Sequence, residues 1–252
     1  MDRQELSALA HADHPIAAPV SASNMGELIR RAACKPDALV LDLGCGPGEW
    51  VLRALQEHPT ARALAVDTSG EALRRAEDSA RERGVGDRVT FVRGDLREFQ
   101  PPRPCDLVLC VGATHAFGGL EETLRAVDEH VGPGGAVLVG EGFWERPPDQ
   151  AALEVLGATP DEYRDLAGTV EAVEAAGWTP VHGHVSEPGE WDDYEWSWSG
   201  SLTRWALDHP EHPDAEAAIE AAREHRTGWL QGYRGVLGFA CLLLQRNRPP
   251  RR

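Results

Sequence analysis

The chain has 252 residues, of which 42% are hydrophobic, and this suits one sizeable globular domain or a domain with a substantial insertion. Its formal net charge of -16 disfavours DNA or RNA as a partner, because nucleic-acid binding needs a basic surface that neutralises phosphates. No apolar run approaches the roughly 20 residues of a membrane span. The N-terminus lacks the apolar core of a signal peptide, so neither a membrane anchor nor secretion is expected.

Two helices are predicted before the first strand, over residues 2–12 and 24–33. Ser23 or Asn24 is expected to cap the second helix, because both side chains can accept a hydrogen bond from the first helical turn. An apolar run over residues 38–43 then predicts a short buried strand.

This strand ends in three glycines spaced two residues apart, Gly44, Gly46 and Gly48, and a helix is predicted immediately afterwards over residues 49–58. Glycines permit positive φ and let the backbone approach a ligand closely. The free N–H groups and the positive dipole end of the new helix favour an anionic group such as a carboxylate. Strand, glycine turn and helix together indicate a nucleotide-type binding element.

Strands and helices continue to alternate beyond this element. The predicted strands cover residues 61–66, 88–93, 106–111 and 136–139, and the predicted helices cover residues 70–83, 120–130 and 169–176. Apolar strands separated by helices imply a parallel sheet covered on both faces. Ser69 is expected to cap the helix at 70–83 and Thr169 the helix at 169–176, and Gly132-Pro133-Gly134-Gly135 is read as a turn. Ligands of such sheets bind beyond the carboxyl ends of the strands, where the strand order reverses.

The pattern changes in the C-terminal half of the chain. Short helices are predicted over residues 150–156 and 160–166, and a longer one over residues 214–233. Residues 178–185 and 236–245 read as strands, and we expect the last strand to close the sheet.

The cysteines are not arranged for metal or disulfide chemistry. There are five, with no CxxC pair, and four lie in or beside apolar strand-like runs: Cys45, Cys105, Cys110 and Cys241. This usage is typical of reduced thiols in a cytoplasmic protein, and it predicts no metal site. Cys45 is interpreted as a small residue that fills the loop rather than as a nucleophile.

The stretch from Asp42 to Gly48 resembles motif I of the class I S-adenosylmethionine (SAM)-dependent methyltransferases. Its G-x-G-x-G spacing differs from the G-x-G-x-x-G of dinucleotide sites. The resemblance extends in order over roughly residues 24–142 and includes Asp67, Gly94-Asp95-Leu96, the strand entered at Pro104 and the turn at residues 132–135. It implies a Rossmann-like α/β fold with a seven-stranded, mostly parallel sheet, helices on both faces and a C-terminal helical cap.

The resemblance also implies SAM as cofactor and S-adenosyl-L-homocysteine as product. Asp67 resembles the acidic residue that binds the ribose hydroxyls, Asp95 the one that meets the adenine amino group, and Asp42 would orient the loop or meet the ammonium. The alternative for each aspartate is that it caps the next turn. The expected cofactor-binding set is Asp42, Gly44, Cys45, Gly46, Gly48, Asp67, Thr68, Asp95, Leu96, Val111 and Gly112.

Two residues are candidates for catalysis. His115 follows the strand at 106–111 and could act as a general base, since an unperturbed imidazole titrates near neutrality. The alternative is that His115 only hydrogen-bonds the substrate or a loop. Glu141 could hold an amine or hydroxyl of the acceptor, or could be a turn residue. The sequence lacks the Asn-Pro-Pro-Tyr motif of the methyltransferases that act on the amino nitrogen of adenine or glutamine.

Tryptophans crowd the stretch from residue 191 to 205. They read either as the core of a helical subdomain or as an aromatic, acidic surface for a small, possibly cationic acceptor. Trp191-Asp192-Asp193-Tyr194 also resembles a bacterial group of small-molecule methyltransferases, which implies that residues 143–177 and 189–232 build a substrate cap. The expected substrate-binding residues are Trp144, Trp191, Tyr194, Trp196 and Trp198.

Together these features predict methyl transfer from SAM to a small-molecule O or N acceptor, by a cytoplasmic monomer or homodimer. Residues 1–37 would supply helices that close over the cofactor, residues 38–142 the SAM-binding core, and residues 143–252 the cap and the last two strands. Two alternatives stay open: a SAM-dependent cyclase or lyase that transfers no methyl, and a non-catalytic SAM-binding sensor or partner protein.

Overall fold

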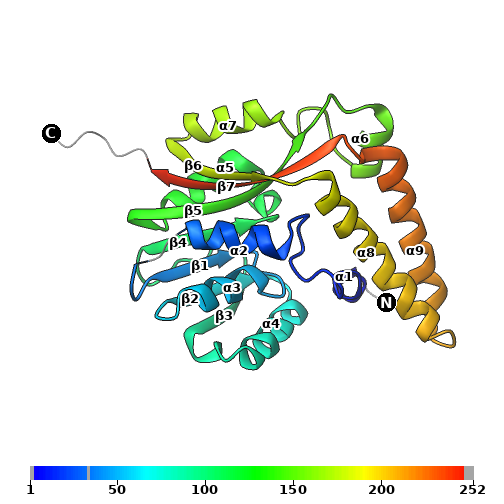
Figure 1. Ribbon diagram of the computed structural model, residues 1–252, viewed down its shortest axis with the longest axis horizontal. Helices are drawn as coiled ribbons and strands as arrows, with labels where there is room; N and C mark the ends of the chain where they lie inside the picture. The colour runs from blue at the N-terminus through cyan, green and yellow to red at the C-terminus, as the bar shows by residue number, and fades with distance from the viewer. Residues whose placement is uncertain (1–2, 33–34, 247–252) are drawn as a thin grey trace. The chain divides into compact units, whose positions relative to one another are not determined.

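The computed structural model describes residues 3–32 and 35–246, so residue 2 of the first predicted helix and Ala33 of the second lie outside the described residues. The strands form a seven-stranded sheet with the order β3-β2-β1-β4-β5-β7-β6 (Figure 1). Its strands are β1 Leu39–Leu43, β2 Arg62–Asp67, β3 Val89–Arg93, β4 Cys105–Val111, β5 Val131–Trp144, β6 Trp178–Val185 and β7 Leu237–Arg246. Strands β1 to β5 pair in parallel, and β6 pairs antiparallel with β7.

The helices follow the predicted alternation through most of the chain. They are α1 Arg3–Ala10, α2 Ala22–Arg31, α3 Glu49–Glu57, α4 Gly70–Glu82, α5 Leu120–Asp128, α6 Gln150–Leu156, α7 Leu166–Ala175, α8 Pro188–Asp208 and α9 Ala215–Gly228. Short 3-10 turns cover Gly86–Arg88 and Thr114–Ala116, and a π-helical turn covers Trp229–Tyr233.

The chain divides into two compact units. We call the first the sheet unit; it comprises Ala22–Glu141, Ala167–Val185 and Ala240–Arg252. We call the second the helical unit; it comprises Met1–Ser21, Gly142–Leu166 and Ser186–Phe239. The division falls inside two long strands, since the last residues of β5 and the first residues of β7 belong to the helical unit.

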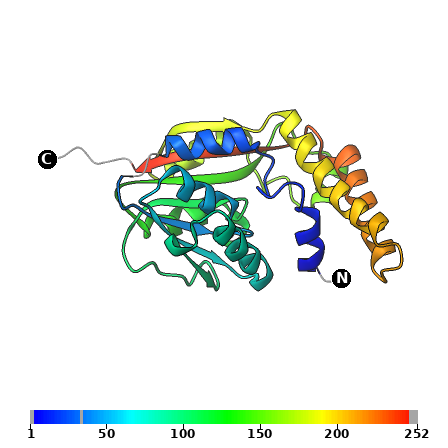
Figure 2. The same cartoon turned by 60° about the horizontal axis from the view of Figure 1, so that its bottom comes forward.

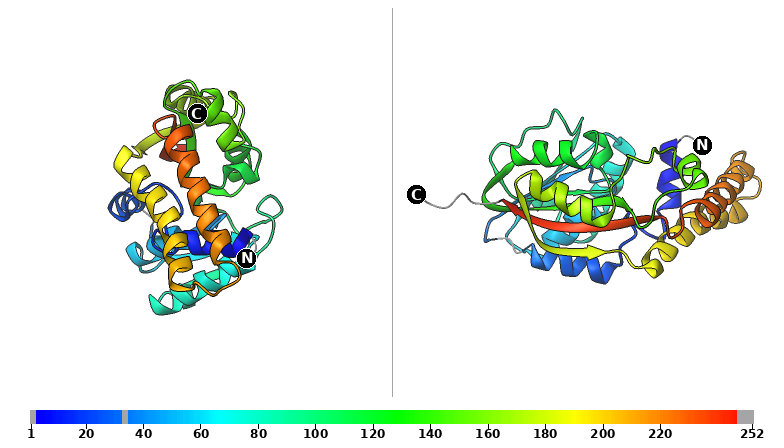
Figure 3. Two further views of the ribbon diagram at one scale, coloured as in Figure 1. Left: turned by 90° about the vertical axis from the view of Figure 1, so that its right-hand side faces the viewer. Right: turned by 90° about the horizontal axis from the view of Figure 1, so that it is seen from above.

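Helices cover both faces of the strands in the sheet unit. Alternate residues of β1 pack in one apolar cluster with Leu124 and Val127 of α5 and Val173 of α7. Helices α2 and α3 contact the strands as well, and Figure 3 shows α2 on the opposite side of the sheet from α5. Because both faces are covered, β1 is buried at all five positions, as its continuous apolar sequence predicts.

The expectation that the last strand closes the sheet is wrong. The last strand, β7, does not close the sheet but lies between β5 and β6, and β6 forms the edge. Burial explains this order, because β7 is buried from Gly238 to Leu244 whereas β6 alternates between covered and exposed residues. Strand β6 also contains Pro180, which has no N–H to donate to a ladder and is tolerated at an edge.

The predicted turn at Gly132-Pro133-Gly134-Gly135 is also wrong, because these residues belong to β5. The register with β4 shifts between Cys105 and Leu107, and Gly134 has a φ of 79°. A Cβ on Gly135 would lie 3.0 Å from the carbonyl oxygens of Cys105 and Asp106. The glycines therefore let the strand pass an irregularity close to its neighbour instead of ending it.

Three predicted helix boundaries need correction. Helix α2 begins at Ala22, so Ser23 and Asn24 lie inside its first turn instead of before it, and the predicted helix at residues 160–166 does not form. Helix α7 begins at Leu166, which places Thr169 inside the helix, where it is buried. Ser69 is the cap that the sequence predicts correctly, since its side chain accepts a hydrogen bond from the Ala72 amide.

One continuous helix, α8, carries the whole tryptophan-rich stretch. A capping box formed by Glu187 and Glu190 and a proline in the first turn define its N-terminus. Figures 2 and 3 show α8 and α9 running side by side, with α1 next to α8. The helix at residues 214–233 ends earlier than predicted, at Gly228, and the π-helical turn follows.

A buried carboxylate joins α8 to α9 and the π-helical turn. Glu195 is 2% exposed and accepts hydrogen bonds from the Tyr233 hydroxyl at 2.7 Å and from His225 Nε2 at 2.6 Å. The Trp198 ring stacks on the His225 ring, with centroids 3.8 Å apart. Burial, followed by the nearby Glu195 charge, raises the pKa of Tyr233, so this hydroxyl stays protonated and keeps donating.

We expect Glu195→Ala to lower the free energy of unfolding by about 3 kcal/mol, because it leaves the buried Tyr233 hydroxyl and the half-buried His225 ring without their acceptor. Glu195→Gln, which keeps one amide oxygen, is expected to cost about 1 kcal/mol. Urea titration followed by circular dichroism measures both, with the exposed Glu224→Ala on α9 as control. An alanine variant as stable as the control would show that the cluster contributes nothing to stability.

Candidate functional site

The carboxyl ends of five parallel strands lie at one edge of the sheet, and the strand order reverses between β1 and β4. The register places Leu43 opposite Val66, Asp67 opposite Arg93 and Val111 opposite Gly140. Asp42, Asp67 and Val111 lie at the carboxyl ends of β1, β2 and β4, and the other predicted cofactor residues lie in the loops that follow β1 to β4. The predicted catalytic residues lie at the same edge. This is where ligands of open α/β sheets bind.

The glycine loop after β1 adopts the conformation that its sequence requires. Gly44, Gly46 and Gly48 have φ values of 80°, 51° and 84°, in the left-handed region that favours glycine. A Cβ on Gly44 would lie 2.4 Å from the Cβ of Ala113, so the loop packs directly on the segment that follows β4. A Cβ on Gly46 would meet nothing within 4 Å, which leaves this side of the loop open to a ligand.

Asp67 at the end of β2 holds this loop. Its Oδ2 accepts from the Gly46 amide and its Oδ1 from the Ser69 amide, both at 2.8 Å. The alternative role as a turn residue is therefore present in the structure. It does not exclude a ligand, because each carboxylate oxygen can accept a second hydrogen bond.

The loop amides are engaged within the protein, which the sequence did not indicate. Those of Gly44 and Cys45 donate to the Val66 carbonyl, and that of Gly48 donates to the Cys45 carbonyl. With the Gly46 amide bonded to Asp67, these four loop amides donate within the protein and are not free donors for a ligand. The positive end offered to an anion is therefore the first turn of α3, which begins at Glu49.

Asp42 lies beneath the loop and is 3% exposed. The Val51 amide at the start of α3 donates to its carboxyl group, and its Oδ2 is buried with no hydrogen-bond partner among the described residues. Burial, followed by the nearby charge of Asp67, raises the pKa of Asp42 to about 8. A buried carboxyl with an unused oxygen fits a role toward a cationic group of a ligand.

The raised pKa of Asp42 makes a pH prediction for the protein without cofactor. The unfolded chain loses this proton near pH 4 and the folded protein only near pH 8, so stability falls as the pH rises between these values. Asp42→Asn keeps an acceptor for the Val51 amide but cannot ionise. As the pH rises from about 5 to about 9, we expect the free energy of unfolding of Asp42→Asn to increase relative to that of the wild type. A difference independent of pH would contradict the raised pKa.

The predicted adenine contact, Asp95, is already paired. Its carboxylate binds the Arg97 guanidinium through Nε at 3.0 Å and Nη2 at 2.6 Å, and it also accepts from the Arg97 amide at 2.9 Å. These bonds lower the pKa of Asp95 to about 2. Leu96 is buried beside Gly44, whereas Thr68 is exposed.

The predicted catalytic residues lie at the same edge of the sheet unit. His115 is exposed in the 3-10 turn after β4. Glu141 is half-buried in β5, next to Gly140, whose carbonyl accepts from the Gly112 amide at the end of β4. Burial, with the charges of Asp42 and Glu141, raises the pKa of the Cys110 thiol, and burial likewise raises the pKa of the Cys45 thiol, so neither forms a thiolate nucleophile at neutral pH.

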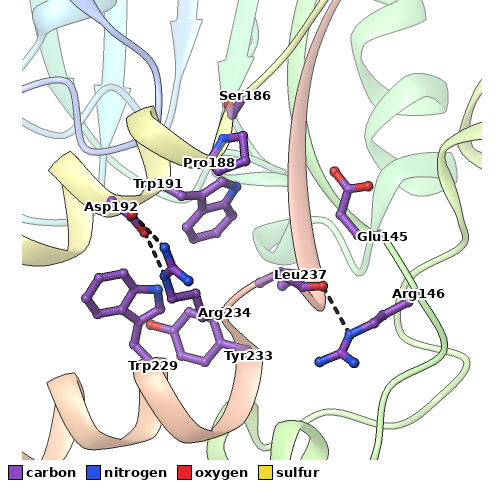
Figure 4. Close-up of a pocket in the computed structure, with 11 residues that line it drawn as sticks. Glu145, Arg146, Ser186, Pro188, Trp191, Asp192, Trp229, Tyr233, Arg234 and Leu237 are labelled. Carbon is purple, nitrogen blue, oxygen red and sulfur yellow. Dashed lines mark hydrogen bonds and ion pairs between the residues drawn. The ribbon is translucent and has the colours of Figure 1, made fainter.

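The predicted substrate-binding residues all lie in the helical unit. Trp144 and Trp191 belong to one apolar cluster, and the rings of Trp191 and Tyr194 meet edge to face. Only Trp191 lines the pocket drawn in Figure 4, together with Tyr233 and other residues that the sequence did not single out. Trp144 is 5% exposed and donates through Nε1 to the Pro160 carbonyl. Trp196 is 51% exposed, Trp198 stacks on His225 and Tyr194 bonds His11.

In residues 3–32 and 35–246, no helix is long and apolar enough to cross a membrane. The same residues contain no group of three or more His, Cys, Asp or Glu side chains placed to hold a metal ion.

The sheet order, the glycine loop, and the acidic residues at the ends of β1 and β2 and after β3 together indicate one class of protein, the class I SAM-dependent methyltransferases. Residues 40–135 match the family described as methyltransferase domain. The chain is 28% identical over 226 residues to YjhP of Escherichia coli (strain K12), covering 89% of this chain and 90% of that protein. It is also 28% identical over 236 residues to trans-aconitate 2-methyltransferase of Streptomyces avermitilis, covering 86% and 85%.

Among solved structures, the SAM-dependent methyltransferase from Thiobacillus denitrificans in complex with S-adenosyl-L-homocysteine superposes with a TM-score of 0.88 at 25% identity. The match covers 98% of this chain and 100% of that chain. The chain is a class I SAM-dependent methyltransferase, as the resemblance in motif I predicted, and the predicted Rossmann-like fold is confirmed.

Proposed function

We propose that this protein transfers a methyl group from SAM to the oxygen or nitrogen of a small molecule. The observation that carries the proposal is the glycine loop at the reversal of strand order, with Asp42 beneath it and Asp67 bonded to Gly46. The matching methyltransferase family over residues 40–135 supports methyl transfer, and a relative named for trans-aconitate methylation supports a small acceptor.

The residues at this edge fit the parts of SAM one by one. Asp67 keeps lone pairs for the two ribose hydroxyls, and the first turn of α3 suits the carboxylate. The buried Oδ2 of Asp42 suits the ammonium, which would favour the ionised form of this carboxyl. The Leu96 amide would meet a ring nitrogen of the adenine, and Asp95 would exchange one of its contacts with Arg97 for the amino group. Thr68, Val111 and Gly112 complete the proposed set.

Bound SAM would supply a methyl group on a positively charged sulfur, open to in-line attack. The chain must then place the acceptor atom, exclude water and, for a hydroxyl or amine acceptor, take a proton. We assign the proton to His115, because the 3-10 turn after β4 presents it at the edge of the sheet unit. Glu141 would hold the acceptor by its hydroxyl or amine hydrogen. A carboxylate acceptor would need no base.

The test is the formation of S-adenosylhomocysteine from SAM with a panel of small acids, phenols and amines. Methyl transfer is supported if S-adenosylhomocysteine forms only when an acceptor is present, and if a methylated acceptor forms in equal molar amount. Methylthioadenosine instead would indicate a cyclase or lyase. Tight SAM binding without turnover on any acceptor would indicate a sensor or partner protein.

A further inference from the structure

Helix α3 begins at Glu49, and no side chain caps its first turn. The first amides of a helix have no carbonyl to bond inside the helix. Here the Val51 amide donates to Asp42 and the Leu52 amide to the carbonyl of the N-cap residue, but the amides of Glu49 and Trp50 have no acceptor among the described residues. The buried Asp42 Oδ2, which also lacks a hydrogen-bond partner among the described residues, independently points to a ligand beside this turn.

Glu49 itself carries a negative charge at this turn. A carboxylate in the first turn of a helix is attracted to the positive end of the helix dipole. If the Glu49 side chain turned back over the first turn, it would take up the two free amides and repel an incoming carboxylate. A side chain of the protein would then compete with the ligand for the same donors.

Arg83 binds the Glu49 carboxylate instead. Its Nη1 donates to Oε1 at 3.1 Å and its Nη2 to Oε2 at 2.5 Å, so both carboxylate oxygens are engaged. The pair is largely buried, with the Glu49 side chain 14% exposed and the Arg83 side chain 28% exposed. A two-point contact of this kind fixes the orientation of a carboxylate as well as its position.

The position of Arg83 in the fold directs the Glu49 carboxylate away from the ligand edge. Helix α4 starts beyond the carboxyl end of β2, and Arg83 ends it, shortly before β3 begins. Because β2 and β3 are parallel, the end of α4 points toward the opposite edge of the sheet, where β3 starts. The start of α3 packs on the middle of α4, since a Cβ on Gly48 would lie 3.0 Å from the Cβ of Ala76. Arg83 therefore draws the carboxylate along α4, away from the glycine loop.

We propose that Arg83 is a positioning residue of the cofactor site: it holds the Glu49 carboxylate away from the first turn of α3 and leaves the Glu49 and Trp50 amides to the carboxylate of SAM. Arg83 acts through Glu49 and does not itself touch the cofactor. Neither residue belongs to the cofactor-binding set predicted from the sequence. This role rests on the placement of SAM proposed above, and it adds the residue that keeps that place open.

The test compares two ligands by calorimetry, S-adenosylhomocysteine and methylthioadenosine. Both contain adenosine and a thioether, but only the first has the amino-acid end with its carboxylate. Arg83→Met should weaken binding of S-adenosylhomocysteine about three- to tenfold, the effect of one charge at a helix terminus, and leave binding of methylthioadenosine unchanged. Arg83→Lys keeps the charge but not the two-point contact, so its affinity should lie between those of the wild type and Arg83→Met.

A second substitution separates positioning from structural support. Adding Glu49→Gln to Arg83→Met removes the freed carboxylate, so the affinity for S-adenosylhomocysteine should return to within about twofold of the wild type, whereas a structural loss would persist. The matched control is Arg81→Met on the same helix, because the Arg81 guanidinium pairs with the exposed Asp78 instead of with α3. This control should bind both ligands as the wild type does.

Three results would overturn the role of Arg83: unchanged binding of S-adenosylhomocysteine in Arg83→Met, equal weakening of both ligands, or no recovery in the double variant. Equal affinity of the wild type for the two ligands is a different failure. It would overturn the placement of the cofactor carboxylate at α3, and the role of Arg83 with it.

Discussion

Asp67→Ala is expected to weaken binding of S-adenosylhomocysteine by about a hundredfold or more. The variant loses the proposed acceptor of the ribose hydroxyls, and each charge-assisted hydrogen bond contributes about 1.5 to 3 kcal/mol, where 1.4 kcal/mol is a factor of ten. It also frees the Gly46 amide, which Asp67 now holds at 2.8 Å. Isothermal titration calorimetry measures the affinity.

The control for this experiment is Asp87→Ala, which removes an exposed carboxylate from a 3-10 turn in the same unit. Asp67→Asn separates the two roles, because its amide oxygen can still accept from one backbone N–H but offers fewer lone pairs to a diol. We expect its affinity to lie between those of the wild type and Asp67→Ala. Affinity equal to the wild type in the alanine variant would reduce Asp67 to a turn residue.

His115→Ala is expected to lower turnover of a hydroxyl or amine acceptor by roughly a hundredfold to ten-thousandfold, the usual contribution of a general base. SAM affinity should change by no more than a few fold, since His115 is not among the residues proposed to hold the cofactor. The side chain is exposed, so little stability should be lost. Steady-state kinetics with the best acceptor and calorimetry with S-adenosylhomocysteine provide the two readouts.

His115→Gln distinguishes proton transfer from hydrogen bonding, because glutamine donates and accepts but cannot act as a base near neutrality. If His115 is the base, the glutamine variant should be as slow as the alanine variant, and both should lose the rise of kcat/KM with pH. If His115→Gln turns over the acceptor much faster than His115→Ala, His115 is a positioning residue and not the base. A rate near that of the wild type in His115→Ala would point to an acceptor that needs no base.

Local patterns in the sequence predicted the cofactor side of the protein well. The apolar run at residues 38–43, the spaced glycines and the helix beginning at Glu49 all appear as expected. Ser69 caps α4, and β6 has the predicted bounds, Trp178–Val185. These features depend on short-range physics: glycine is needed where φ is positive, and a serine oxygen reaches the amide three residues ahead.

Features that depend on distant parts of the chain were predicted poorly. The residues near positions 132–135 do not indicate that these glycines lie close to the backbone of β4 and form part of strand β5. The tryptophans of α8 do not form a single stripe, because they face several different partners, as Trp198 on His225 and Trp191 on Tyr233 illustrate. A helix with several buried sides lacks the one-sided periodicity on which sequence reading depends.

By itself, the sequence determined the class of protein and the loop that defines it, because the G-x-G-x-G spacing and the acidic residues after it carry their own conformational requirements. Only the tertiary structure decided that β7 lies inside the sheet, that the loop amides are engaged within the protein, and that Arg83 binds the carboxylate of Glu49. Strand order and hydrogen-bond satisfaction are properties of the packed chain. Residues far apart in sequence decide them together, so no local pattern contains them.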